Sequence, residues 1–414
     1  MSIKPLPITD FDSFIKILAD AYPGIKLVTN QDKQAMKQRM IRQQEDPTVQ
    51  FYGFYRSGVL QGGMRCNDFI INIRSHLVKA GGVGSIAVDL LHKKEKIAKT
   101  MMIHFLQHYR QQGAVLALLY PFRPDFYRKM GFGYGTKMNQ YRLAPLSLPT
   151  DGSKGNLRYL THSDQLALNQ CYQRVLATTP GLIEKSAFEL SNIFRQSKNK
   201  IVAYQRDGQV QGYLIFQFET TRPDNFLLND LRIVELVYEH REALSALLAF
   251  LRSQADQIKT IIFNTQDENF HYLLHDPRNN SNNLNILYHE SNTQGVGIMY
   301  RVINIPRLFH ALRECNFGNQ TCRLKVSVTD TFLPDNGGDF YLQFQRGYPT
   351  VTRVAPFDVE ISLDIAEFSA LMMGCVNFRT LYAYKLAEIS NPDYVDTLEA
   401  LFYTRQKPVC TTIF

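Results

Sequence analysis

The sequence predicts a mixed α/β protein built from two or three domains. With 414 residues, the chain is too long for one ordinary hydrophobic core. Hydrophobic residues make up 45% and charged residues 20%, the usual balance of a globular protein. A buried strand, an amphipathic helix and a second buried strand follow one another over residues 83–120, and the same order returns over residues 231–263. Such alternation is typical of parallel strands joined by helical crossovers.

The first domain is expected to span residues 1–145. Residues 11–21 predict its first helix, because apolar positions follow an acidic capping region. Residues 51–59 predict a strand followed by a turn, and residues 64–73 and 75–80 predict further strands.

The first crossover has a local signal at each step. Residues 85–88 are a short apolar run after three glycines, which suits a buried strand. Asp89 then stands where a helix N-cap is expected. Apolar residues recur every fourth position over 97–109, so one helix face is apolar, and Gly113 suits the helix end. Residues 114–120 form a near-continuous apolar run, typical of a strand buried on both faces.

The predicted first turn of this helix is crowded with lysines, namely Lys93, Lys94, Lys96 and Lys99. Helix N-termini bind anions, because their first backbone N–H groups lack partners and the helix dipole is positive there. Lysine side chains can contact phosphate as point charges. The segment therefore indicates a polyphosphate site, and the alternative is a solvated helix face whose charges bind nothing specific.

A short helix is predicted between Pro124, which opens a helix well, and Gly131, which closes one well. This helix carries Tyr127. A phenol with a pKa near 10 is a poor base at neutral pH, but it can donate a proton to a leaving group. The alternative is a core tyrosine whose hydroxyl binds a carbonyl.

The second domain is expected to span residues 146–298, because residues 145–155 are rich in Pro, Ser and Gly and resemble a linker. Its order of elements repeats that of the first domain. Helices are expected at 169–176, 187–194 and 239–255, and strands at 200–204, 211–219, 231–238 and 258–263.

The last domain is expected to span residues 299–414. Its first helix is predicted at 305–312, where Pro306 suits the first turn. Further strands are expected at 324–329, 340–345 and 359–363, and helices at 364–374, 378–387 and 394–402.

Two motifs in the first domain resemble a known family. One is the stretch Ile86-Ala87-Val88-Asp89-Leu90-Leu91-His92-Lys93-Lys94-Glu95-Lys96-Ile97, and the other is Tyr127 followed by Gly131-Phe132-Gly133. Both resemble the acetyl-CoA-binding region of GNAT-superfamily N-acetyltransferases, and in particular the Eis (enhanced intracellular survival) type. The order of elements along the chain resembles tandem GNAT folds followed by a sterol-carrier-protein-like domain, as Eis enzymes have.

The resemblance implies a role for each matched position. Backbone amides at Ile86 and Val88 would hold the pantetheine arm and the thioester carbonyl. The loop that follows would hold the pyrophosphate. One position departs from the family pattern, because a lysine stands where the family loop has its central glycine. The implied pyrophosphate-binding residues are Lys93, Lys94, Lys96 and Ile97.

The resemblance also implies a mechanism. Tyr127 would be the general acid that protonates the departing thiolate, and the terminal carboxylate, here that of Phe414, would be the general base.

The second GNAT fold lacks the glycine signature and is expected to hold no cofactor. The implied activity is acetyl-CoA-dependent N-acetylation of an amine, either an aminoglycoside-like polyamine or a lysine side chain. Eis relatives assemble as hexamers, so a homo-oligomer is expected.

Composition limits the other classes of function. No window of 18 residues is wholly apolar, so no membrane span is expected. The first residues lack the apolar core of a signal peptide, and the six cysteines show no CxxC pair, which favours reduced thiols in the cytoplasm. The net charge of +8 suits a polyanionic cofactor and also suits weak nucleic-acid binding, although no nucleic-acid partner is expected.

Three alternatives stay open at the level of sequence. His104 and His108 are spaced i, i+4, which suits a metal, but no third ligand accompanies them and no metal is expected. The lysine at position 96 is also compatible with a scaffold that has lost turnover and binds an apolar ligand in its last domain. A double-GNAT protein could instead transfer another group, such as an aminoacyl unit.

Overall fold

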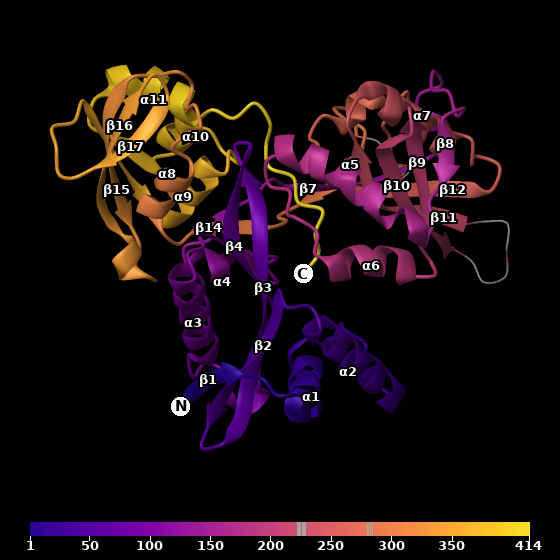
Figure 1. Ribbon diagram of the computed structural model, residues 1–414, viewed down its shortest axis with the longest axis horizontal. Helices are drawn as coiled ribbons and strands as arrows, with labels where there is room; N and C mark the ends of the chain where they lie inside the picture. Colours follow the sequence, from indigo (N-terminus) through magenta and orange to yellow (C-terminus); the bar gives the residue numbers. More distant parts are fainter. Residues whose placement is uncertain (222–224, 226–228, 280, 282, 284) are drawn as a thin grey trace. The chain divides into compact units, whose positions relative to one another are not determined.

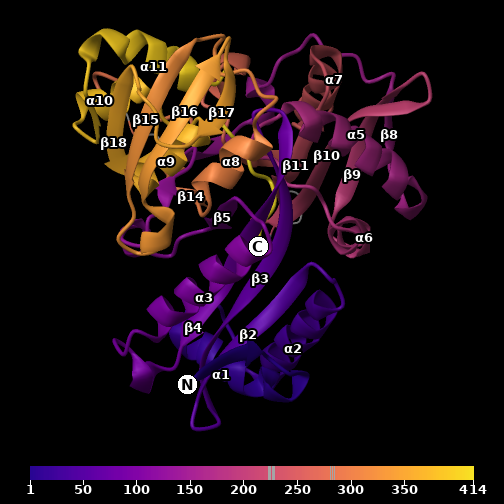
Figure 2. The same cartoon turned by 60° about the vertical axis from the view of Figure 1, so that its left-hand side comes forward.

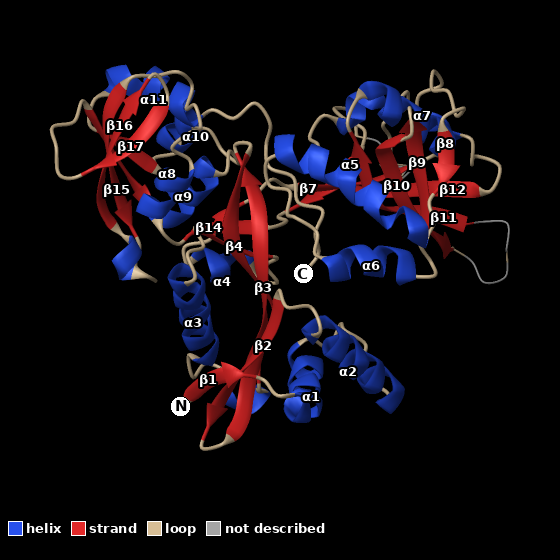
Figure 3. Ribbon diagram, in the orientation of Figure 1, coloured by secondary structure: helices blue, strands red, loops and turns tan. Residues whose placement is uncertain are grey.

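The computed structural model describes residues 1–221, 225, 229–279, 281, 283 and 285–414. Helices and strands are interspersed along the described chain, with several runs of consecutive strands (Figure 3). The described residues divide into two compact units, which are considered separately below. The first comprises Met1–Gly135, Ile298–Lys407 and Thr412–Phe414, and the second comprises Thr136–Gly297 and Pro408–Thr411.

The first unit contains a seven-stranded sheet in the order β1-β2-β3-β4-β5-β14-β6 (Figure 1). Strands β4 and β5 are parallel, as the crossover predicts. Strand β14 comes late in the sequence, yet it lies between β5 and β6 and is antiparallel to both. The strands are β1 (Ser2–Pro5), β2 (Val49–Arg56), β3 (Val59–Ile73), β4 (His76–Val88), β5 (Leu116–Leu119), β6 (Gly133–Tyr134) and β14 (Met299–Val302).

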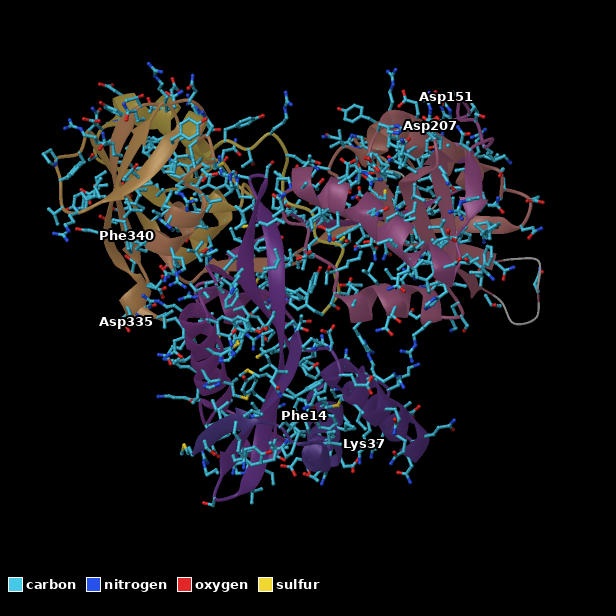
Figure 4. All side chains as sticks on the ribbon, viewed as in Figure 1. Phe14, Lys37, Asp151, Asp207, Asp335 and Phe340 are labelled. Carbon is cyan, nitrogen blue, oxygen red and sulfur yellow. The ribbon has the colours of Figure 1, made fainter. Side chains whose placement is uncertain are left out.

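Helices cover both faces of this sheet. A Cβ on Gly62 would meet Met101 of α3, whereas one on Gly63 would meet Phe14 of α1 at 2.7 Å. Because neighbouring strand residues point to opposite faces, α1 and α3 pack on opposite sides. Phe14 is fully buried in the core beneath α1 (Figure 4). The helices of this part are α1 (Phe11–Ala21), α2 (Asn30–Gln44), α3 (Ile97–Gln111) and α4 (Pro124–Arg128).

The first unit also contains the C-terminal domain, whose five-stranded sheet has the order β17-β16-β15-β18-β19 (Figure 2). Its strands are β15 (Cys322–Thr329), β16 (Gly338–Gln345), β17 (Tyr348–Thr352), β18 (Val359–Asp364) and β19 (Ala387–Ile389). Its helices are α8 (Ile305–Ala311), α9 (Ile365–Met372), α10 (Phe378–Ala383) and α11 (Val395–Phe402).

The second unit contains another seven-stranded sheet, in the order β13-β7-β12-β11-β10-β9-β8. Strands β11 and β12 are parallel, which confirms the second predicted crossover. The strands are β7 (Met138–Leu143), β8 (Leu157–Tyr159), β9 (Lys200–Arg206), β10 (Gln209–Thr220), β11 (Asn229–Tyr238), β12 (Ile258–Thr265) and β13 (Asn292–Gly295). The helices are α5 (Gln165–Thr178), α6 (Ala187–Arg195) and α7 (Arg241–Arg252).

Two local predictions are wrong in detail. Lys93, Lys94 and Lys96 precede the first turn of α3, and of the four lysines only Lys99 lies in it, because Asp89 caps a separate short 3-10 turn over Leu90–His92 and α3 begins only at Ile97. The helix predicted at 378–387 ends at Ala383, because Lys385 takes a left-handed φ of 56° before the chain enters β19. Among the described residues, no helix is long and apolar enough to cross a membrane.

Candidate functional site

The pairing of β4 with β5 stops well before the carboxyl end of β4. The recorded parallel pairing joins Ala80, Gly81 and Gly82 to β5 and stops there, although β4 continues to Val88. On its other edge β4 stays paired with β3 as far as Val88. The last six residues of β4 therefore extend beyond this pairing, because β5 itself ends at Leu119, and Ile86 and Val88 both lie in this segment.

Tyr22, the residue directly after α1, lies beside the edge of β4 that faces away from β3, which is called the free edge here for residues 83–88. Its hydroxyl donates a hydrogen bond of 2.5 Å to the carbonyl oxygen of Ile86. In a strand, the N–H and C=O of one residue point to the same edge. The amide of Ile86 therefore points towards the side on which Tyr22 lies, and it is placed to donate to a ligand entering between β4 and β5.

The loop between β4 and α3 leaves the N-terminus of α3 open. Lys94 and Lys96 both take left-handed backbone conformations, with φ of 68° and 63°, and Lys96 is the N-cap residue. The first turn of α3, which the structure describes in full, contains no acidic residue. The carboxylate of Glu95 points away from the start of α3. It accepts a hydrogen bond of 2.5 Å from the Arg56 guanidinium and lies 3.3 Å from a ring nitrogen of His92.

The electrostatics of this loop favour an anion. The hydrogen bond from the Arg56 side chain, followed by that from His92, lowers the pKa of the Glu95 carboxyl group. Lys93, Lys94 and Lys96 are exposed. Positive charge therefore surrounds a helix end whose first backbone N–H groups are directed outward.

Tyr127 is buried in a cluster of aromatic rings. Its side chain is 2% exposed, and its ring centroid lies 5.8 Å from that of Phe122, 5.2 Å from that of Phe126 and 6.1 Å from that of Phe132. Burial, and secondarily the nearby Tyr22 hydroxyl, raises the pKa of Tyr127. The phenol is therefore protonated at neutral pH, so it can act as a general acid and not as a general base.

The side chain of Phe414 packs against the same sheet. Its ring centroid lies 4.9 Å from that of Phe69 and 5.3 Å from that of Tyr120. A Cβ on Gly84 would lie 3.1 Å from the carboxyl carbon of Phe414 and 3.2 Å from a guanidinium nitrogen of Arg65. Glycine at position 84 thus lets the carboxyl group and a buried cation approach β4 together.

The structure brings the predicted residues together around one end of β4. Ile86 and Val88 lie on the free edge, and the positions from Lys93 to Ile97 follow directly as the loop and start of α3. Phe414 reaches Gly84, two residues before Ile86. Tyr22 connects Tyr127 to the strand. Its ring centroid lies 6.0 Å from that of Phe122, which also packs against Tyr127, and its hydroxyl donates a hydrogen bond to Ile86.

Sequence reasoning missed Tyr22 and Arg65. Neither belongs to a recognisable motif, and each reaches the site through tertiary packing: Tyr22 from the end of α1 and Arg65 from the middle of β3. A charged residue in the middle of a predicted strand was the one signal available, because a buried arginine requires a partner or an anion nearby.

The two histidines of α3 belong to a ring cluster. The rings of His104 and His108 stack with their centroids 6.1 Å apart. The centroid of the Tyr52 ring lies 5.5 Å from that of His104 and 5.6 Å from that of His108. Burial, followed by the charge of His108, lowers the pKa of His104. Within the described ranges, no group of three or more His, Cys, Asp or Glu side chains is arranged to hold a metal ion.

Comparison with known families agrees with this geometry. Residues 2–135 match the model of an acetyltransferase (GNAT) domain. Residues 182–302 match a second acetyltransferase (GNAT) domain model, and residues 308–411 match a sterol carrier protein domain.

The relatives point to the same class. An uncharacterized N-acetyltransferase of Streptomyces griseus is 23% identical over 363 residues, which are 81% of this chain and 82% of the relative. A GCN5-related N-acetyltransferase structure from Anabaena variabilis has a TM-score of 0.82 at 18% identity, covering 100% of both chains. The structure of Eis1 from Mycobacterium abscessus has a TM-score of 0.78 at 18% identity, also covering 100% of both chains.

The matched domains and the curated relatives identify this protein as an N-acetyltransferase of the GNAT superfamily. Its architecture is that of tandem GNAT domains followed by a sterol-carrier-protein domain, as predicted. GNAT acetyltransferases use acetyl-CoA as co-substrate. The free edge of β4 and the open, cationic N-terminus of α3 fit such a thioester and its pyrophosphate.

Proposed function

We propose that this enzyme transfers the acetyl group of acetyl-CoA directly to an amine, in the manner of Eis-type enzymes. The observation that carries the proposal is the segment of β4 that extends beyond its pairing with β5, beside the open end of α3. The acceptor is an aminoglycoside-like polyamine or a lysine side chain. The whole-length structural likeness to Eis1 of Mycobacterium abscessus supports the choice of this branch.

Each residue around β4 has a task in this proposal. The amides of Ile86 and Val88 bind the pantetheine arm and polarise the thioester carbonyl. Lys93, Lys94 and the amides at Lys96 and Ile97 bind the pyrophosphate. This assignment requires a loop that leaves its amides accessible, and the left-handed conformation at position 96 keeps the backbone path that a glycine would take.

Phe414 and Tyr127 are the proton acceptor and the proton donor of the reaction. The carboxyl group of Phe414 accepts the proton that the acceptor nitrogen loses as it attacks the carbonyl carbon. The carbon–sulfur bond then breaks, and Tyr127 gives its proton to the thiolate. The burial that keeps Tyr127 protonated, and the approach of the Phe414 carboxyl group to Gly84, support these two roles.

The loop geometry disfavours the binding-scaffold alternative. That alternative depended on lysine at position 96 closing the phosphate loop. Lys96 instead adopts the left-handed conformation and its side chain is exposed, so the N-terminus of α3 is not covered by it.

The test measures thiol release from acetyl-CoA by the full chain in the presence of a panel of amines. We expect Tyr127→Phe to lower kcat by about a hundredfold while the melting temperature stays close to wild type. One glycine added after Phe414 should cause a comparable loss, because it moves the carboxyl group. Tyr141→Phe, which alters a buried tyrosine of the second unit, serves as the matched control. Full activity in both the Tyr127 and the tail variants would show that these roles are wrongly assigned.

A further inference from the structure

The turn that ends α4 is held by a buried arginine from a distant part of the sequence. Tyr127 lies one residue before the end of α4, and its carbonyl oxygen accepts hydrogen bonds from the amides of Met130 and Phe132, at 2.9 and 3.2 Å. The carbonyl of Met130 in turn accepts a 2.5 Å hydrogen bond from the guanidinium of Arg301. Arg301 comes from β14 and is fully buried.

Glycine at the end of this turn makes room for the guanidinium. Gly131 has a φ of 77°, and a Cβ there would lie 1.6 Å from a terminal nitrogen of Arg301. The turn and the arginine therefore pack closely, with no room between them for a side chain at position 131.

The C-terminal domain supplies the counter-charge. The other terminal nitrogen of Arg301 donates to both carboxylate oxygens of Asp330, at 2.8 and 2.6 Å. Asp330 follows β15 and also accepts from the amide of Leu333 at 2.8 Å and from the side chain of Asn336 at 3.2 Å. These bonds fix the direction of the carboxylate and hence that of the guanidinium.

A second ion pair holds the same short helix from the other side. Arg128, directly after Tyr127, pairs with Glu367 of α9, whose side chain is buried. The backbone beyond α4 also approaches α9 closely, because a Cβ on Gly133 would lie 2.1 Å from the carbonyl oxygen of Ala366. The segment from α4 to β6 is thus in contact with α9 of the C-terminal domain at two points.

We propose that the sterol-carrier-protein domain positions the general acid of the neighbouring GNAT domain, with Arg301–Asp330 and Arg128–Glu367 as the two positioning pairs. The inference rests on the role proposed above for Tyr127. Neither pair touches the reacting atoms, so all four are positioning residues. Their effect passes through the backbone of α4, whose displacement by a fraction of an ångström would misplace the phenol.

The main test separates stability from positioning. The paired variant Arg301→Met/Asp330→Asn removes both charges together, keeps the volume of the arginine stem and leaves an acceptor for the amide of Leu333. It lacks the hydrogen bond to Met130. We expect kcat to fall about tenfold or more while the KM for acetyl-CoA stays within about twofold of wild type.

A second measurement asks whether the loss passes through Tyr127. In a Tyr127→Phe background the paired variant should lose little further activity, because the acid it positions is already absent. The deficit of the paired variant should also shrink with an acetyl donor that carries selenium in place of the thiol sulfur of coenzyme A. A selenolate leaves readily without protonation, so a misplaced acid matters less to its departure.

Controls keep the test decisive. Arg74→Met removes another guanidinium that donates to a backbone carbonyl, that of Phe402 at 2.6 Å, away from α4. It should lower stability without changing the leaving-group dependence. Glu367→Gln, which removes one charge and keeps a hydrogen-bonding group, replaces the paired variant if that protein does not fold.

Two results would overturn the proposal. One is wild-type kcat in a folded paired variant, or in Glu367→Gln where that variant is used. The other is a loss of the same size with the sulfur and selenium donors. Failure of the parent mechanism is distinguishable, because it would appear as full activity of Tyr127→Phe alone.

Discussion

The most informative perturbation of the loop is a two-step series at position 96, from lysine to alanine to glycine. Lys96 has a φ of 63° and is the N-cap of α3, yet its side chain makes no capping hydrogen bond. A side chain in the left-handed region costs about 1–2 kcal/mol, a cost that glycine avoids. Glycine also gives the unfolded chain more freedom, which offsets about 0.5–1 kcal/mol.

The series separates backbone strain from charge. Lys96→Ala removes the charge and keeps the left-handed cost, whereas Lys96→Gly removes both. We therefore expect the glycine variant to be more stable than the alanine variant by about 0.5–1 kcal/mol. Because both variants lose the same exposed charge, their difference in acetyl-CoA affinity reports the Cβ alone, and glycine should bind more tightly.

The assay is urea unfolding of both variants, with acetyl-CoA titrations by calorimetry under the same conditions. The slope of the free energy of unfolding against urea should be the same in both proteins, since the change is local. Equal stability of the alanine and glycine variants would refute the reasoning, because it would show that position 96 is not held in the left-handed region.

Three further predictions follow from the contacts. Gly84→Ala should lower kcat about tenfold with little loss of stability, measured by steady-state kinetics and thermal melting, because its Cβ would displace the carboxyl group of Phe414. Gly131→Ala should cost about 3 kcal/mol of unfolding free energy, because it combines a left-handed φ with a clash against a buried guanidinium. The Arg158 side chain, followed by backbone hydrogen bonding, lowers the pKa of Asp164 to about 2, so its ionised form stabilises the fold above about pH 4. That contribution should vanish as pH falls towards 2, and Asp164→Asn should flatten the acid limb of a melting-temperature profile.

The sequence predicted those parts of the fold that have local causes. Helix α1 begins and ends where its apolar pattern does, and α4 begins at Pro124 as predicted. The parallel pairing of β4 and β5 followed from two apolar runs around an amphipathic helix. In each case the signal lies within a few residues of the feature it predicts.

Features that depend on long-range pairing could not be predicted in the same way. The pairing of β4 with β5 ends at Gly82, and the bulge that follows, where Ser85 has a φ of 52°, has no local motif that predicts it. The placement of β14 between β5 and β6 joins segments more than a hundred residues apart. The pair formed by Arg301 and Asp330 follows from that placement, so neither residue stood out in the sequence.

The central claim is that β4 and α3 of the first domain hold acetyl-CoA. The most direct measurement is a calorimetric titration of acetyl-CoA into the full chain and into Lys93→Glu. The account predicts binding in the range of about 1 μM to 1 mM for the wild-type chain, and a loss of at least tenfold when an acidic side chain faces the pyrophosphate. An affinity unchanged by Lys93→Glu, or no binding at millimolar acetyl-CoA, would contradict it.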